Sequence, residues 1–154
     1  MRSHSVLALM LLILIGLSSC SPTSSFPPPI PSPDDGWNVT LTQTGGFAGV
    51  HLVIRVSSDG MLLAEDRRSG LVISRPASKS LLQDLTRMIA NGELPKGSPP
   101  PSVCADCFVY DLQIISNRGS LRIQTDDSNL KRSGAEELIL FLVDARDRAL
   151  SSGN

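Results

Sequence analysis

The chain has 154 residues, with 14 Lys or Arg against 15 Asp or Glu, and its formal net charge is −1. It contains one Trp and one Tyr and no basic stripe, so binding to nucleic acid through base stacking and phosphate contacts has little support. The only long apolar run lies near the N-terminus, which excludes a transmembrane channel or transporter. The remaining length is enough for one small domain with its own core.

The first twenty residues predict a secretory signal that ends in a lipid anchor. Arg2 gives a positive start, and residues 6–17 form an apolar run too short to remain as a spanning helix. The run ends in Leu17-Ser18-Ser19-Cys20, which resembles the lipobox of bacterial lipoproteins, where the cysteine thiol takes a diacylglyceryl group. The alternatives are an ordinary secretory signal or a short buried helix, with Cys20 incidental in either case. We therefore expect cleavage after residue 19 and a lipid on Cys20, which would hold the protein outside the cytoplasm on a bacterial cell membrane or outer membrane.

Residues 20–36 are predicted to be a spacer between this anchor and a folded domain. Six prolines fall between positions 22 and 33 among serines and threonines, a composition typical of a stiff, solvated segment. The folded domain then covers residues 37–150, and residues 151–154 form a tail. The spacer would hold that domain clear of the membrane.

Four strands are predicted first, over 38–43, 51–56, 61–66 and 71–75, because apolar residues alternate there between turn signals. A helix follows, capped by Ser78 or Ser80 and carrying an apolar stripe of leucines, Met88 and Ile89. A hairpin of strands over 108–116 and 121–125 comes next.

A closing helix is predicted after Ser133, which has capping-box spacing to Glu136. Its apolar positions, from Leu138 to Ala149, keep helical spacing. The order of four strands, helix, two strands and helix predicts an α+β domain. We expect an antiparallel sheet of about four to six strands, with two helices packed on one face.

Cys104 and Cys107 are three positions apart in a segment that is predicted to lie outside the cytoplasm. Two nearby cysteines in such a compartment most often form a structural disulfide. Free thiols, or a metal or redox site, remain as alternatives. A redox site usually places its thiolate at a helix N-terminus, whereas here prolines precede the pair and a predicted strand follows it.

The predicted domain contains few residues that could act in catalysis. His51 is the only imidazole left after signal cleavage, and strand alternation places it on the face opposite Leu52 and Ile54. The neighbouring acids at 126–127 and 136–137 suit a strand end and a helix start. No hydrolase, zinc-protease or phosphate-loop motif is present in the sequence. The sequence thus predicts a protein that is not an enzyme and that needs no cofactor and no metal.

A glycine-rich segment between the first two strands is the best candidate for a partner-binding loop. It consists of Gly45, Gly46, Phe47, Ala48 and Gly49, and its glycines permit positive φ and close backbone approach. Phe47 could be an exposed anchor for a partner, or it could fold back on the core. Residue chemistry alone favours the second arrangement.

This segment, placed directly after a first strand, is similar to the opening of the emfourin-like proteins, small bacterial inhibitors of thermolysin-like metalloproteases. The strand at 108–112, its hairpin and the closing helix also resemble that family. The resemblance implies a small α+β domain that blocks a protease without chemistry of its own. The lipobox, the proline-rich spacer and the cysteine pair depart from the simplest members.

Together these patterns predict a membrane-anchored lipoprotein with a non-catalytic binding domain, whose partner would be a metalloprotease. The alternative is an envelope scaffold or recognition lipoprotein that binds another envelope protein and inhibits nothing. A thiol-dependent enzyme using Cys104 and Cys107 is a third and weaker hypothesis.

Overall fold

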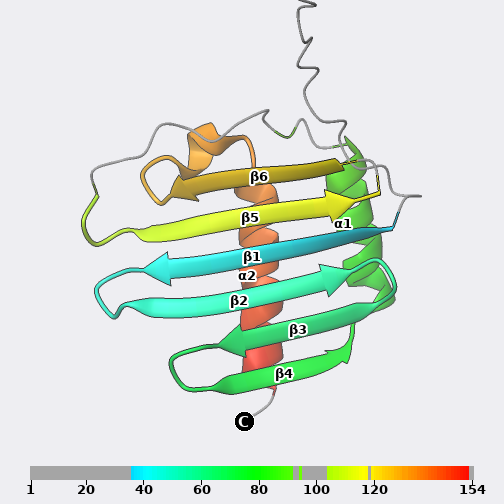
Figure 1. The fold of residues 1–154 in the computed structure, drawn as a ribbon, viewed down its shortest axis with the longest axis horizontal. Helices are drawn as coiled ribbons and strands as arrows, with labels where there is room; N and C mark the ends of the chain where they lie inside the picture. The colour runs from blue at the N-terminus through cyan, green and yellow to red at the C-terminus, as the bar shows by residue number, and fades with distance from the viewer. Residues whose placement is uncertain (1–35, 92–93, 95–103, 118, 153–154) are drawn as a thin grey trace, which may run out of the picture.

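The computed structural model describes residues 36–91, 94, 104–117 and 119–152. In these segments a six-stranded antiparallel sheet is covered on one face by two helices, which is the predicted α+β fold (Figure 1). Cys20, the signal and most of the spacer lie outside the described residues. The elements are β1 (Trp37–Gly45), β2 (Val50–Ser57), β3 (Met61–Asp66), β4 (Leu71–Pro76), α1 (Lys79–Asn91), β5 (Phe108–Ser116), β6 (Gly119–Asp126), a 3-10 turn η2 (Leu130–Ser133) and α2 (Glu136–Ser151).

The first strand in the chain lies in the middle of the sheet. The spatial order is β4-β3-β2-β1-β5-β6, so β1 joins the four-strand meander to the later hairpin. Its nine residues pair with β5 from Trp37 opposite Ser116 to Gly45 opposite Phe108. This pairing brings the end of β1, where the glycine-rich segment begins, beside the start of β5.

The core lies between the sheet and the two helices. Alternate residues of every strand face the helices, as the period of two in the sequence predicts. The fully buried members of this layer include Val39, Leu41, Ile54, Leu112, Ile114 and Ile123 from the strands, with Leu85, Ile89, Ile139 and Leu142 from the helices.

Val53 is buried although it lies on the opposite face of the sheet from that core. It is 1% exposed and stands between Thr42 on β1 and Glu65 on β3. Neighbouring side chains on adjacent strands cover it, because strands of a sheet are only about 5 Å apart. The alternation therefore predicts correctly which face of the sheet Val53 lies on. It does not predict that a side chain on the face away from the helices is buried in the middle of the sheet.

The cap of α1 is Ser78, one of the two candidates. Its Oγ accepts a hydrogen bond of 3.2 Å from the N–H of Leu81, and the helix begins at Lys79. The other candidate, Ser80, already lies inside the helix. Neither helix in the described part of the chain is long and apolar enough to cross a membrane.

The predicted capping box of the closing helix is wrong. Ser133 ends the short 3-10 turn, where its Oγ donates to Leu130 C=O at 2.6 Å and accepts from Ala135 N–H at 3.1 Å. Gly134 follows with φ of 69°, and the N-cap position of α2 is Ala135, which makes no side-chain cap. The serine hydroxyl thus makes its hydrogen bonds within and just after the 3-10 turn. Glu136 and Glu137, in the first turn of α2, complement the positive end of the helix dipole.

Ile139 and its neighbour Leu140 provide a test of which side of α2 supports the fold. Ile139 is fully buried, whereas Leu140 is 47% exposed. Ile139→Ala should lower the free energy of unfolding by about 2–5 kcal/mol, because it removes buried methyl groups and leaves a cavity. Leu140→Ala should change it by less than about 0.5 kcal/mol. Urea unfolding followed by circular dichroism measures both, and equal losses would contradict this packing.

Candidate protein-binding loop

The glycine-rich segment forms a tight turn at the end of the β1–β2 hairpin. The N–H of Gly49 donates to the C=O of Gly46 at 2.9 Å, which leaves Phe47 and Ala48 at the tip. Gly46 N–H donates to Cys107 C=O at 3.1 Å, so the base of the turn is bound to the segment before β5. The turn is therefore held by one hydrogen bond within the hairpin and by another to the segment that precedes β5.

Two of these glycines are required by their surroundings. Gly45 has φ of 89°, and a Cβ there would lie 2.5 Å from the backbone oxygen of Cys107. Gly46 has φ of 69°, and a Cβ there would lie 2.3 Å from the ring of Phe108. Both positions combine a left-handed backbone with no room for a side chain, so glycine is the residue that fits. The glycine pattern in the sequence therefore reflects a close contact with β5.

Phe47 is 99% exposed. The arrangement that residue chemistry favoured, with Phe47 folded back on the core, is wrong. The Phe108 ring occupies the space over Gly46, and the backbone of the turn carries Phe47 outward. Arg68, in the β3–β4 turn, donates from its guanidinium to the C=O of Ala48 and braces the tip from the other side.

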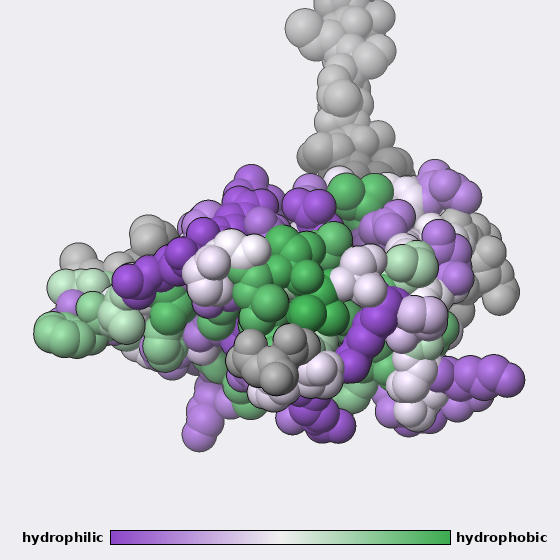
Figure 2. Space-filling model, turned by 90° about the horizontal axis from the view of Figure 1, so that it is seen from below, coloured by the Kyte–Doolittle hydropathy of each residue, from purple (hydrophilic) through white to green (hydrophobic). Residues whose placement is uncertain are grey.

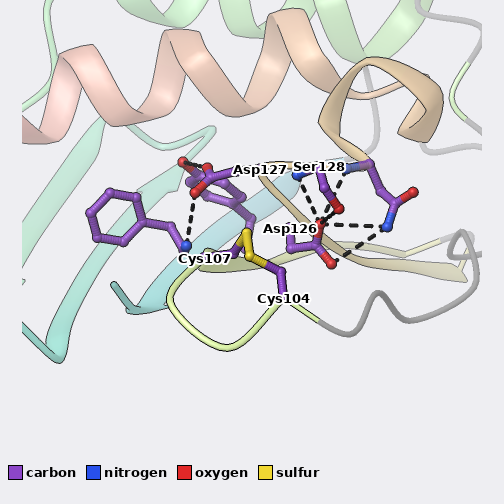
Figure 3. The surroundings of a disulfide bond; sticks show 8 residues. Cys104, Cys107, Asp126, Asp127 and Ser128 are labelled. Carbon is purple, nitrogen blue, oxygen red and sulfur yellow. Dashed lines mark hydrogen bonds between the residues drawn. A yellow bond between two sulfur atoms is a disulfide. The ribbon is translucent and has the colours of Figure 1, made fainter. Parts of the chain in front are cut away.

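A disulfide between Cys104 and Cys107 closes the loop that supports this turn. The two Cα atoms are 5.5 Å apart, so the favoured interpretation of the cysteine pair is confirmed. Figure 3 shows the disulfide beside the residues that end β6. Because Cys107 is both a disulfide partner and the acceptor for Gly46 N–H, the cross-link limits the movement of that acceptor.

Asp127 fixes the start of β5 from the other side of the disulfide loop. Its carboxylate accepts from Phe108 N–H at 2.8 Å and from the Tyr110 hydroxyl at 3.0 Å (Figure 3). The adjacent Asp126 accepts from Ser128 and Asn129 and organises the turn after β6. The acid pair at 126–127 thus ends a strand, as the sequence predicts.

Burial and the neighbouring carboxylate change the acidity of Tyr110. Burial, together with the hydrogen bond and the charge of Asp127, raises the pKa of its phenol to about 12. The hydroxyl therefore stays protonated and acts as a fixed donor to Asp127.

A buried arginine lies beneath the same end of the sheet. Arg146 on α2 is 2% exposed, donates to Gln43 Oε1 at 2.7 Å and contacts Asp147 at 2.8 Å. Gln43 is opposite Tyr110 in the β1–β5 register, so the arginine links α2 to the central strands below the loop. Nothing in the local sequence pattern predicts a buried cation here, although Arg146 lies four positions after the buried Leu142 and therefore on the same side of the helix.

His51 does not join a catalytic arrangement in the described residues. Its Nε2 lies 3.2 Å from the guanidinium of Arg67, which also pairs with Glu65. No group of three or more His, Cys, Asp or Glu within the described segments could hold a metal ion. What the end of the sheet offers is a braced loop with an exposed aromatic side chain.

A separate hollow of about 430 Å³ lies between the end of β4 and the two helices. Its apolar walls include Leu62, Leu81 and Phe141. The charged side chains at its rim already have partners: Asp144 pairs with Arg148, and Arg75 donates to Ser152 Oγ. The hollow is therefore a weaker candidate for a binding site than the loop.

Comparison of the chain with protein-family models finds no match, and a search of curated proteins finds no similar sequence.

The single tyrosine gives a direct test of the contact between Tyr110 and Asp127. In the native protein at pH 11, absorbance at 295 nm should show only about a tenth of Tyr110 ionised, against about nine-tenths for an ordinary phenol. The folded-state pKa lies above the unfolded one, so its contribution to stability is complete below pH 10 and is lost as the pH rises toward 12. Asp127→Asn should lower the pH at which half of Tyr110 is ionised. An unchanged titration midpoint would contradict the assigned hydrogen bond.

Arg146 and Arg148 provide a matched pair for the buried cluster. Arg146→Ala should lower the free energy of unfolding by about 1–3 kcal/mol, because it leaves the buried Oε1 of Gln43 without this donor. Arg148→Ala breaks only an exposed pair with Asp144 and should leave stability almost unchanged. Chemical denaturation measures the free energy of unfolding of both variants. Similar losses in the two would contradict a stabilising role for the buried contacts of Arg146.

Proposed function

We propose that this domain is a non-catalytic binding module that inhibits a thermolysin-like metalloprotease through its Phe47 loop. A lipid on Cys20 would hold it outside the cytoplasm of a bacterial cell, with the spacer giving it reach. The observation that carries the proposal is an aromatic side chain, 99% exposed, at the tip of a turn held by neighbouring segments.

Exposure of this kind suits a contact with another protein. Aromatic residues at the centre of an interface often dominate its binding energy, because they fill a pocket and exclude water. A lone exposed side chain is common on protein surfaces, so the bracing matters more than the exposure. Cys107 and Arg68 fix the turn before binding, which reduces the conformational entropy that association would otherwise cost.

The resemblance to the emfourin-like proteins is what selects a protease as the partner. The glycine-rich turn supports it, since each required glycine lies in the segment that carries the resemblance. The same loop would also suit a different envelope protein, in which case the chain would be a recognition or scaffold lipoprotein. The experiment below separates these two functions.

The test is a titration of the purified chain, with its disulfide intact, against thermolysin-like enzymes and unrelated metalloproteases. We expect near-stoichiometric inhibition of the first group only. Phe47→Ala should weaken inhibition about 30- to 1000-fold, as expected for loss of a dominant interface residue. Leu140→Ala, which truncates an exposed apolar side chain on α2, is the matched control and should inhibit normally.

Inactivity against every enzyme at large excess would remove the protease proposal. A pull-down from envelope extract, with the Phe47→Ala variant as the comparison, then tests the recognition function. A protein recovered by the original chain and lost with Phe47→Ala would assign the loop to that partner.

A further inference from the structure

We infer that the disulfide between Cys104 and Cys107 is a redox switch that controls the order of the Phe47 loop. In the oxidised protein the cross-link steadies the carbonyl that receives the N–H of Gly46, and reduction by a dithiol releases that carbonyl. The effect of reduction on binding rests on the proposed function, whereas its effect on the loop can be measured without a partner.

The disulfide is accessible to a reductant. Cys104 is exposed and Cys107 is partly buried, so Cys104 is the partner that an attacking thiolate reaches more easily. The attack forms a mixed disulfide at Cys104 and expels the sulfur of Cys107 as a thiolate, which then takes a proton. The second thiol of the reductant next displaces Cys104 from the mixed disulfide. Two electrons and two protons have then passed to the protein, and the dithiol has become a disulfide.

The fold as a whole does not depend on this cross-link. The cysteines are three positions apart, and a disulfide that closes so short a loop removes little entropy from the unfolded chain. Neither cysteine belongs to the buried core between the sheet and the helices. Figure 2, which views the molecule from the β4 side, shows apolar residues gathered in the middle of that face. Reduction should therefore leave the domain folded and change only the surroundings of the disulfide.

The disulfide fixes one side of a peptide group that joins the loop to β5. The peptide bond between Cys107 and Phe108 uses both of its polar groups. Its C=O accepts from Gly46 N–H at 3.1 Å, and its N–H donates to the carboxylate of Asp127 at 2.8 Å. On the Phe108 side this peptide continues into β5. On the Cys107 side, within the described part of the chain, the cross-link to Cys104 is the bond that holds the backbone, and breaking it allows the peptide to rotate.

The close contact at Gly45 makes the loop sensitive to such a rotation. A Cβ at Gly45 would lie 2.5 Å from the Cys107 oxygen, so the two backbones are packed against each other. When the Cys107 carbonyl turns, Gly46 loses its acceptor and the adjacent Phe47 loses one of its two braces. The other brace, from Arg68 to the tip of the turn, does not involve Cys107 and remains. The reduced loop is thus less ordered but still attached at its tip.

Amide hydrogen exchange of the full chain, before and after reduction with dithiothreitol, tests the switch without a partner. The N–H groups of Gly46 and Phe108 should exchange at least about tenfold faster after reduction, because both depend on the released peptide. The N–H of Ser58, which donates to Trp37 C=O at the other end of β1, is the matched control. Its exchange rate should stay within about twofold, since that end of the sheet is unaffected.

A double variant separates reduction from other effects of the reagent. Cys104→Ser combined with Cys107→Ser keeps side chains of similar size but cannot form the cross-link. Gly46 should exchange at the faster rate in this variant without dithiothreitol and show no further change with it. In a titration against a thermolysin-like enzyme, the variant should inhibit about tenfold more weakly than the oxidised chain, because its loop must be ordered on binding. The variant replaces the reductant in that assay because thiolates also bind zinc.

Contrary results at either level overturn the switch. A disulfide that stays intact in excess dithiothreitol, an unchanged exchange rate at Gly46, or loss of protection throughout the sheet would exclude a local release of the loop. Equal inhibition by the double variant and the oxidised chain would exclude control of binding. If the oxidised chain inhibits no enzyme, the proposed function fails, and exchange at Gly46 still decides whether the disulfide controls the loop.

Discussion

The pairing of β1 with β5 is the constraint on which the rest of the structure depends. These strands are separated by more than sixty residues in the chain, yet they form the centre of the sheet. Val39 and Leu41 of β1 and Leu112 and Ile114 of β5 are almost completely buried on the same face. A slip of one residue would turn this apolar set away from the helices, so the hydrophobic pattern fixes the register. The register in turn places Cys107 where its carbonyl receives the N–H of Gly46.

The buried polar cluster below the loop follows from the same register. Gln43 and Tyr110 lie opposite each other, one bound to Arg146 and the other to Asp127. Burying a cation is costly unless its hydrogen bonds are made, and Arg146 makes them to the amide of Gln43 and the carboxylate of Asp147. A satisfied network of this kind holds its members in one geometry. The end of the sheet that presents Phe47 is consequently supported by directional contacts as well as by apolar packing.

The sequence predicted the elements better than their ends. Alternating apolar residues identified six strands, because a half-buried sheet leaves that pattern directly in the chain. The cap of α1 is one of the two serines expected, Ser78, whereas the capping box at Ser133 failed because its hydroxyl bonds to Leu130 C=O, a partner that spacing alone does not reveal. The position of β1 in the middle of the sheet, and with it the contact of Gly45 with Cys107, depends on long-range pairing. Local patterns contain no record of such pairing.

The outward orientation of Phe47 shows the same limit at the candidate site. A large aromatic residue favours burial by its area alone, and this led to the expectation of a core position. Phe108 and the Cys107 backbone already fill the space beside the glycines, so Phe47 is directed to solvent. The glycines that seemed to provide freedom are in fact required for a close fit.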